Sequence, residues 1–260
     1  MTGPGTNTFL IGRDRVAVLD PGPEYEGHYQ AILAAGAGRI QWVVVTHTHK
    51  DHSPLAARLA AETGAQLIGC MLRPPDQFQD TSFQVERDLQ HGECLRTVEF
   101  TLEAVFCPGH VGNHFCFYLH QDRLLFSGDH IMDGSTVVIL PPSGDMKDYL
   151  DSLSRLETYP AVGIAPGHGN LIPEPGKVID TLRRHRLMRE QKVLSAMRKV
   201  GAGTILDYLP VVYDDVDPKL HFYARFSLWA HLLKLERDGL ARRTSRDAEF
   251  DHEGWELIAA

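Results

Sequence analysis

Paired cysteines, long apolar runs and excess positive charge are all missing from this sequence. The four cysteines among 260 residues have no close paired spacing, which excludes metal-knuckle and redox motifs and indicates buried thiols in a reducing compartment. The longest apolar runs, such as Trp42–Val45, are too short to cross a bilayer. The net charge of −8 excludes a chain that coats nucleic acid by charge alone. The stretch Met1–Asn7 has no basic cluster before an apolar run, so it predicts no secretory signal. We therefore expect a soluble, cytoplasmic protein with no membrane partner.

The first two-thirds of the sequence alternates short apolar stretches with helical patterns. Strands are expected at residues 15–20, 41–46, 66–69, 98–106, 115–119, 123–126 and 162–165. Helices are expected at 27–36, at 53–64 with Ser53 as a cap and Gly64 as the stop, and from Asp145 onward. Strands that alternate with helices predict a layered α/β domain, here residues 1–175.

The pattern changes after Pro175. A long charged helix is predicted over 176–200, and Thr204 with Asp207 has the spacing of a capping box. An amphipathic helix is predicted over 218–238, followed by two short strands. Helices followed by a hairpin are the order of a winged helix, so residues 176–260 are predicted to form a second domain. The two long helices also offer a surface for a homodimer.

The segment Thr46–His52 carries the strongest chemical signal. It places His47, His49, Asp51 and His52 within six residues, directly after an apolar strand. Imidazoles and carboxylates packed this closely would destabilise the fold unless a cation were bound among them. Three more apolar strands end in small residues and then present His110, Asp129 and His168. Strand ends at one edge of a sheet converge, so these segments predict one metal site.

The pattern His47-x-His49-x-Asp51-His52, followed by His110, Asp129 and His168, resembles the metallo-β-lactamase superfamily. Over nearly the whole chain, the sequence is similar to the beta-lactamase-like hydrolases with a C-terminal winged helix. The resemblance implies an αβ/βα sandwich of two facing sheets. It also implies that His47, His49 and His110 hold one metal, that Asp51, His52 and His168 hold a second, and that Asp129 bridges them. Asp20 matches the family's first-motif Asp and is expected to orient a ligand; its alternative role is to cap a turn.

Imidazole and carboxylate ligands suit zinc, with manganese or iron as alternatives. Two zinc ions would share a bridging hydroxide at neutral pH, and that hydroxide would attack an ester-type bond. Asp51 and Asp129 are the predicted catalytic carboxylates.

Several neighbouring residues have two interpretations. His114 faces either the cleft or the core. Lys50 is expected to point to solvent, His130 away from the site, and Cys107 into the core. Tyr208, Tyr213 and Tyr223 would stack on a base if the tail bound RNA, and otherwise belong to the tail's core.

Three functions remain open. The leading hypothesis is hydrolysis of a small thioester, ester or lactone. The alternative is endonucleolytic cleavage of single-stranded RNA, in which arginines of the tail would contact phosphates. These arginines are Arg183, Arg184, Arg186, Arg189, Arg242, Arg243 and Arg246. A third hypothesis is a non-catalytic winged-helix binding protein, which the complete ligand set disfavours.

Overall fold

The computed structural model describes residues 5–246 and 249–258. Residues 1–4, within the stretch considered for a signal, and residues 247–248, between the last two strands, lie outside the described residues. In the described part, no helix combines the length and apolar character needed to span a membrane.

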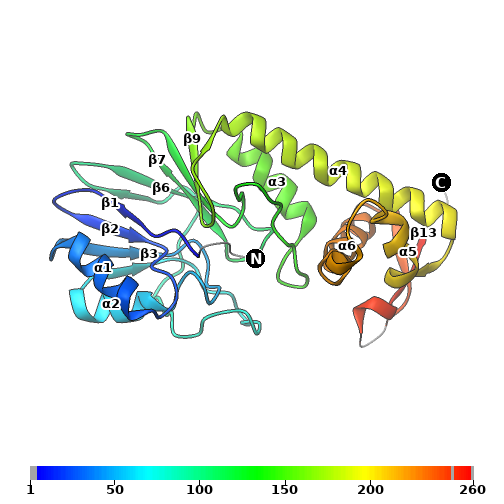
Figure 1. Ribbon diagram of the computed structural model, residues 1–260, viewed down its shortest axis with the longest axis horizontal. Helices are drawn as coiled ribbons and strands as arrows, with labels where there is room; N and C mark the ends of the chain where they lie inside the picture. Colours follow the sequence, from blue (N-terminus) through cyan, green and yellow to red (C-terminus); the bar gives the residue numbers. More distant parts are fainter. Residues whose placement is uncertain (1–4, 247–248, 259–260) are drawn as a thin grey trace.

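Two sheets face each other in the first part of the chain. The smaller sheet has the order β1 (Phe9–Ile11), β2 (Val16–Leu19), β3 (Ile40–Val44) and β4 (Gln66–Ile68). Its outer face is covered by α1 (Glu26–Gly36) and α2 (Leu55–Thr63) (Figure 1). Both β2 with β3 and β3 with β4 pair in parallel, so the ends of β2 and β3 meet at the same edge of this sheet.

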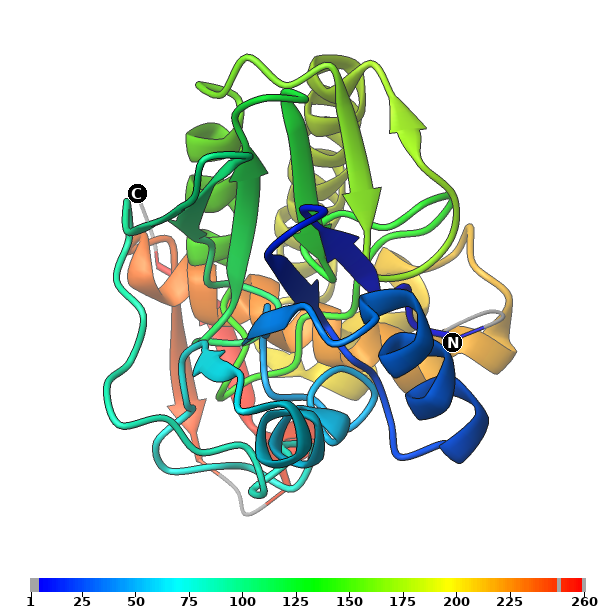
Figure 2. The ribbon, with the colours of Figure 1, turned by 90° about the vertical axis from the view of Figure 1, so that its left-hand side faces the viewer.

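The larger sheet has six strands. Their order is β10 (Ile172–Pro173), β9 (Gly163–Pro166), β8 (Leu124–Gly128), β7 (Phe115–Leu119), β6 (Thr101–Phe106) and β5 (Cys94–Arg96). Its outer face packs against α3 (Met146–Leu156) and the first half of α4 (Pro175–Val200). Figure 2 shows both helices behind this sheet. The chain therefore forms the expected αβ/βα sandwich.

Alternation along the strands builds the layers of the sandwich. In β3, Trp42 and Val44 point between the sheets, whereas Val43 packs under α1 and α2. In β7, Phe117 points between the sheets and Cys116 toward α3 and α4. Strands that are buried on both faces need apolar residues at every position, and this explains why these segments are short continuous apolar runs.

The tail forms a small helical unit with a three-stranded sheet. Its elements are β11 (Gly203–Thr204), α5 (Ile205–Val212), η1 (Pro218–Leu220), α6 (His221–Arg237), β12 (Ala241–Ser245), η2 (Phe250–His252) and β13 (Gly254–Leu257). The expected capping box forms, because Thr204 and Asp207 bond each other's backbone at the start of α5. The sheet order is β11-β13-β12. This arrangement is the expected winged helix.

Helix α4 belongs to the cores of both units. Ile179 and Leu182 pack with the larger sheet and α3, whereas Val193 and Met197 pack with α5, α6 and Trp255. Figure 1 shows α4 running from the sandwich to the winged helix. The domain boundary after residue 175 stays a prediction.

Two local expectations were wrong. The strand expected from residue 98 begins at Thr101, because the Thr97 hydroxyl accepts hydrogen bonds from the backbone of Glu99 and Phe100 and closes a turn that leaves Val98 exposed. Ser53 does not cap α2: its hydroxyl donates to Asp80. Gly64 does end that helix, in the left-handed conformation.

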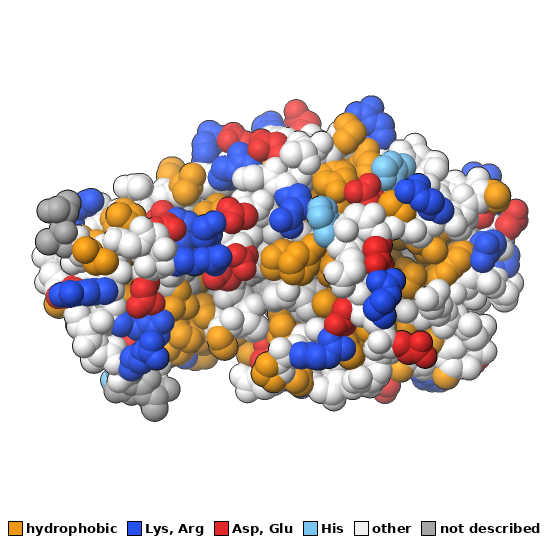
Figure 3. Space-filling model, turned by 180° about the vertical axis from the view of Figure 1, so that it is seen from behind, with side chains coloured by type: hydrophobic (Ala, Val, Ile, Leu, Met, Phe, Trp, Pro, Cys, Tyr) orange, Lys and Arg blue, Asp and Glu red, His pale blue; other side chains and the backbone are white. Residues whose placement is uncertain are grey.

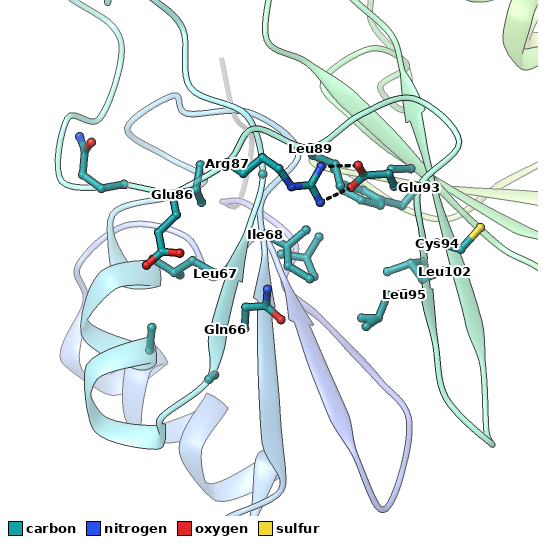
Figure 4. Close-up of a pocket in the computed structure, with 18 residues that line it drawn as sticks. Gln66, Leu67, Ile68, Glu86, Arg87, Leu89, Glu93, Cys94, Leu95 and Leu102 are labelled. Carbon is teal, nitrogen blue, oxygen red and sulfur yellow. Dashed lines mark hydrogen bonds and ion pairs between the residues drawn. The ribbon is translucent and has the colours of Figure 1, made fainter.

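A cleft of about 600 Å³ lies between the edge strands β4 and β5. Leu67, Ile68 and Leu95 line it, and the ion pair between Arg87 and Glu93 crosses it (Figure 4). None of the seven predicted ligand residues lines this cleft, so it is separate from the candidate site.

Candidate metal centre

The ends of five strands bring the predicted site residues together. Asp20 follows β2, and the segment from His47 to His52 follows β3. In the larger sheet, His110, Asp129 and His168 follow β6, β8 and β9. The two sheets present these ends at one edge of the sandwich, so residues far apart in sequence meet there.

The seven predicted ligand residues, called the ligand cluster below, form two groups. One contains His47, His49 and His110; the other contains Asp51, His52, Asp129 and His168. Within each group, one ligand-type atom from every residue lies within 4.8 Å of the others. The partition is the one that the resemblance implied, although the ligand roles themselves stay predictions.

Asp129 faces both groups. Its Oδ1 lies 3.3 Å from His52 Nε2 and 3.3 Å from His168 Nε2. Its Oδ2 lies 3.8 Å from His110 Nε2, in the other group. One carboxylate thus directs one oxygen toward each group, which is the geometry that a bridging ligand requires.

The free atoms of the second group fit a divalent cation. His52 Nε2, Asp129 Oδ1 and His168 Nε2 are buried without a hydrogen-bond partner. Buried polar atoms without partners destabilise a fold, and nitrogen and oxygen donors gathered around one point are the ligands that such cations use. This donor set supports binding of a divalent metal.

The opposite ring nitrogen of four histidines is held by another group. His47 Nδ1 lies 3.0 Å from the Thr46 hydroxyl, and His52 Nδ1 lies 3.0 Å from Asp20 Oδ2. Backbone carbonyls hold the other two: Val138 O lies 2.8 Å from His110 Nδ1, and Gly5 O lies 3.0 Å from His168 Nδ1. Such partners fix the ring orientation and leave Nε2 free to bind a metal.

Asp20 organises the end of β3. Its carboxylate accepts hydrogen bonds from both the backbone N–H and the hydroxyl of Thr46, each at 2.7 Å, as well as contacting His52. Asp20 is 2% exposed, and its backbone has a φ of 49°. Asp20 therefore positions a ligand from the layer behind the cluster.

The three-histidine group is held neutral. Burial lowers the pKa of His47 far below its ordinary value, and neighbouring imidazoles lower it further. Burial, and then the unfavourable interaction that a second charge would have with the neighbouring His110, lower the pKa of His49 to about 3. Burial also lowers the pKa of His110. Neutral imidazoles keep a lone pair free, as metal binding requires.

The second group is strongly coupled. Burial acts to lower the pKa of His168, but the adjacent carboxylates of Asp129 and Asp51 outweigh it and raise that pKa to about 10. Burial likewise opposes charge on His52, whose pKa is nevertheless raised by Asp129 and Asp20. Against burial, His52 and His168 hold the pKa of Asp129 well below its usual range. The carboxylates thus draw positive charge into this group, and a bound cation would replace that charge.

A pocket of about 310 Å³ opens beside the ligand cluster. His49, Asp51 and His110 line one part of it, and Phe78, Val138 and Leu140 supply apolar walls. A small molecule seated there would lie against ligand residues of both groups.

The other predicted residues fall mostly outside this pocket. Lys50 is exposed at its rim and donates to the Gln77 carbonyl. His114 is fully buried behind the cluster, where its Nε2 accepts from the Asp129 N–H, so it packs rather than facing the cleft. His130 is buried against Tyr149 and Cys107 lies in the core.

In the winged helix, Tyr208 and Tyr213 are buried and Tyr223 is 43% exposed.

The carbonyls of Val138 and Gly5 were not predicted as partners of ligand histidines, because backbone oxygens carry no sequence signal.

Comparisons with known sequences agree with this architecture. The family model described as Metallo-beta-lactamase superfamily matches residues 1–168, and the Beta-lactamase associated winged helix domain matches 204–255. A Drosophila melanogaster protein named Beta-lactamase-like protein 2 homolog is 30% identical over 96% of this chain and 89% of its own length. The Atrochrysone carboxyl ACP thioesterase AgnL7 of Paecilomyces divaricatus is 29% identical over 75% of this chain and 60% of its own.

Solved structures show the same fold. A metallo-beta-lactamase family protein from Thermus thermophilus matches 97% of this chain and 94% of its own with a TM-score of 0.76 at 20% identity. Another structure, described as a di-iron-bound form, matches 67% of this chain and 92% of its own with a TM-score of 0.54 at 24% identity. The sandwich, the winged helix and the matched family models together establish that the chain is a hydrolase of the metallo-β-lactamase superfamily.

Proposed function

We propose that the protein hydrolyses a small thioester, ester or lactone with two divalent cations held by the ligand cluster. His47, His49 and His110 would hold one cation, Asp51, His52 and His168 the other, and Asp129 both. Bound cations of this kind supply an activated water and stabilise the negative charge that develops on the carbonyl oxygen.

Asp51 is the cluster carboxylate that faces the substrate pocket. Its side chain is 34% exposed and lines the pocket, and Oδ2 lies 3.3 Å from His168 Nε2. Burial would raise the pKa of Asp51, but His168 and His52 outweigh it and lower that pKa. An ionised carboxylate at this position would orient the attacking water, accept a proton from it and pass that proton to the leaving group.

The pocket beside the cluster is the observation that carries the choice of an acyl substrate. Phe78, Val138 and Leu140 form apolar walls next to His49 and His110, and apolar walls with a few convergent polar groups suit a small organic group. The thioesterase name of the Paecilomyces divaricatus relative supports the same bond class.

The structure gives less support to RNA cleavage. Five of the seven arginines expected to contact phosphates already form ion pairs, four of them with one partner residue each: Arg183 with Glu157, Arg184 with Asp180, Arg189 with Asp215 and Arg242 with Glu256. Arg243 pairs with Glu236 and Glu253. Figure 3 shows Lys and Arg side chains interspersed with Asp and Glu. Phosphates would have to compete with these carboxylates, so the arginines do not form a free basic track.

Zinc is the proposed metal because imidazoles dominate the ligand cluster. Iron is the alternative that the di-iron-bound neighbour supports, and manganese stays an alternative as well. The homodimer and the cytoplasmic location stay predictions.

Paired turnover assays test the function. Zinc-loaded protein would be given a panel of thioesters and lactones beside a labelled single-stranded RNA. We expect acyl turnover with intact RNA. RNA cleavage without acyl turnover would overturn the proposal.

Asp129→Ala is the blank, and metal content is measured in parallel. This variant should lose metal and nearly all turnover, because both groups of the cluster share its carboxylate. The exposed Asp122→Ala is the matched control and should keep both. Full activity with two metals in Asp129→Ala would contradict the ligand assignment.

A further inference from the structure

A second pocket, called the interdomain pocket below, lies between the sandwich and the winged helix. Its volume is about 220 Å³, and its walls come from residues 136–138, from α4 and from residues 213–227. Its polar lining includes His185, Arg186, Arg189, Tyr223 and Ser227. Among the described residues that line it there is no Asp or Glu. In a chain with a net charge of −8, a pocket lined by two arginines and a histidine is suited to an anion.

Arg186 is the central feature of the interdomain pocket. It is 4% exposed, and within the described part of the chain it forms no ion pair. One guanidinium nitrogen donates to Val137 O at 2.6 Å, while Nε is buried without a hydrogen-bond partner. A buried charge without a counter-charge is strongly unfavourable. An anion bound beside Arg186 would supply both the missing charge and an acceptor for Nε.

The neighbouring groups supply further hydrogen-bonding groups to this pocket. Arg189 also lines it, although Asp215 balances part of its charge. Burial, and then the charges of Arg186 and Arg189, lower the pKa of His185, whose Nδ1 is also buried without a partner. The hydroxyls of Tyr223 and Ser227 are further donors for anion oxygens.

Val138 connects the interdomain pocket to the candidate metal centre. It lines both the interdomain pocket and the pocket beside the ligand cluster, and its carbonyl contacts His110. One elongated substrate that passes over Val138 would therefore have one end beside Arg186 and the other beside His110 and His49.

We propose that the interdomain pocket binds the phosphate of a phosphate-bearing thiol, and that the acyl thioester of this thiol is the substrate. The inference rests on the proposed acyl hydrolysis. In the reaction, water adds to the acyl carbonyl and the C–S bond breaks. The acid leaves from the pocket beside the cluster, and the thiol, which takes up a proton, stays attached through its phosphate until release. The winged helix thus recognises the leaving group.

Two thioesters with the same acetyl group test this assignment. One is acetyl phosphopantetheine, which carries a phosphate, and the other is acetyl N-acetylcysteamine, which carries none. For the unaltered protein we expect a KM about tenfold lower for the phosphorylated thioester, close to the contribution of one hydrogen bond to a charged group.

Two variants would remove the difference in KM by different means. Arg186→Gln removes the buried charge, and Ser227→Glu adds a repelling charge at the half-buried wall. Both should hydrolyse the neutral thioester as the unaltered protein does, which also verifies that the metal centre is intact. Arg184→Gln, on the same helix but outside the interdomain pocket and paired with Asp180, is the control and should keep the difference.

Calorimetric titration of the metal-free protein with phosphopantetheine gives a readout independent of turnover. Binding that is lost in Ser227→Glu supports the interdomain pocket even if no thioester is hydrolysed, in which case only the proposed reaction fails. Equal KM values for the two thioesters, with no phosphopantetheine binding, would overturn the pocket assignment and leave acyl hydrolysis standing. Displacement of phosphopantetheine by single-stranded RNA that the enzyme also cleaves would assign the pocket to RNA instead.

Discussion

At the scale of single residues, Asp20 holds Thr46 and His52 in place at the candidate metal centre without belonging to the ligand cluster. Asp20→Asn keeps the shape of the side chain, and Asn tolerates the positive φ at this position. The amide cannot offer His52 and Thr46 the same pair of acceptor oxygens. We expect metal affinity to fall by about 10- to 100-fold, measured by chelator competition. The exposed Asp14→Asn is the control, and unchanged affinity in Asp20→Asn would contradict its positioning role.

The raised pKa values of His52 and His168 predict that metal binding releases protons. Because the pKa of His168 is raised to about 10 and that of His52 is also raised, we expect both rings to carry a proton near neutral pH in the metal-free protein. A ligand imidazole must be neutral, so loading should release about two protons and apparent affinity should rise with pH. Calorimetry in buffers of different ionisation enthalpy measures this number. Metal binding without proton release would show that the imidazoles of His52 and His168 are already neutral in the metal-free protein.

The same shift predicts how the stability of the metal-free protein depends on pH. The folded-state pKa of His168 lies above its ordinary value of 6.5. Its ion pair therefore stabilises the fold fully below about pH 6.5 and ceases to do so as the pH rises through about 10. Denaturant midpoints across this window should fall in the metal-free protein. If the denaturant midpoints of the metal-free protein stayed constant from pH 6.5 to 10, the raised pKa of His168 would be contradicted.

The residues of the ligand cluster were predictable because they follow apolar strands in a recognisable order. The contacts that hold these ligand residues in place were not predictable from the sequence. Gly5 O meets His168 across 163 positions, and Val138 O meets His110 across 28, and any residue type presents the same carbonyl. Thr46 is the exception, since its hydroxyl sits directly beside His47 in the sequence.

At the scale of elements, Gly109 sets the distance between β6 and α3. It has a φ of 140°, and a Cβ there would lie 2.4 Å from the Tyr149 Cα. Gly109→Ala should therefore destabilise the fold by about 1–3 kcal/mol and displace the adjacent His110. Gly176→Ala, in α4 with open space around it, is the control. Denaturant unfolding compares the two, and equal stabilities would contradict the close packing.

The elements buried on both faces were predicted well, because their apolar runs are unambiguous. The short edge strands β1, β5 and β10 were missed. Strands of two or three residues depend on a neighbouring strand for their hydrogen bonds rather than on their own composition. Some ion pairs of the tail arginines were not predicted for a related reason, since the partner carboxylate lies far away in sequence, as with Arg183 and Glu157.

At the scale of the whole molecule, we expect the two units to unfold cooperatively, because α4 contributes residues to both cores. Leu182 is 8% exposed within the core of the sandwich, yet the same helix carries Val193 of the winged-helix core. Leu182→Ala should cost about 2–5 kcal/mol. Scanning calorimetry of Leu182→Ala should show a single unfolding transition, with a lower midpoint temperature than that of the unaltered protein. Two separated transitions, of which only one moves, would show that the units unfold independently.

The contact between Gly5 and His168 has a practical consequence for making the protein. A chain spans at most about 3.6 Å per residue, and Gly5 O lies 3.0 Å from a ring of the ligand cluster. An affinity tag fused before residue 1 would therefore start only a few residue lengths from the metal centre. A polyhistidine tag at that end would be able to supply foreign imidazoles to the cations and distort measured stoichiometry. Figure 1 places β13, the last strand, on the side of the winged helix away from the sandwich, so a purification tag belongs after this strand.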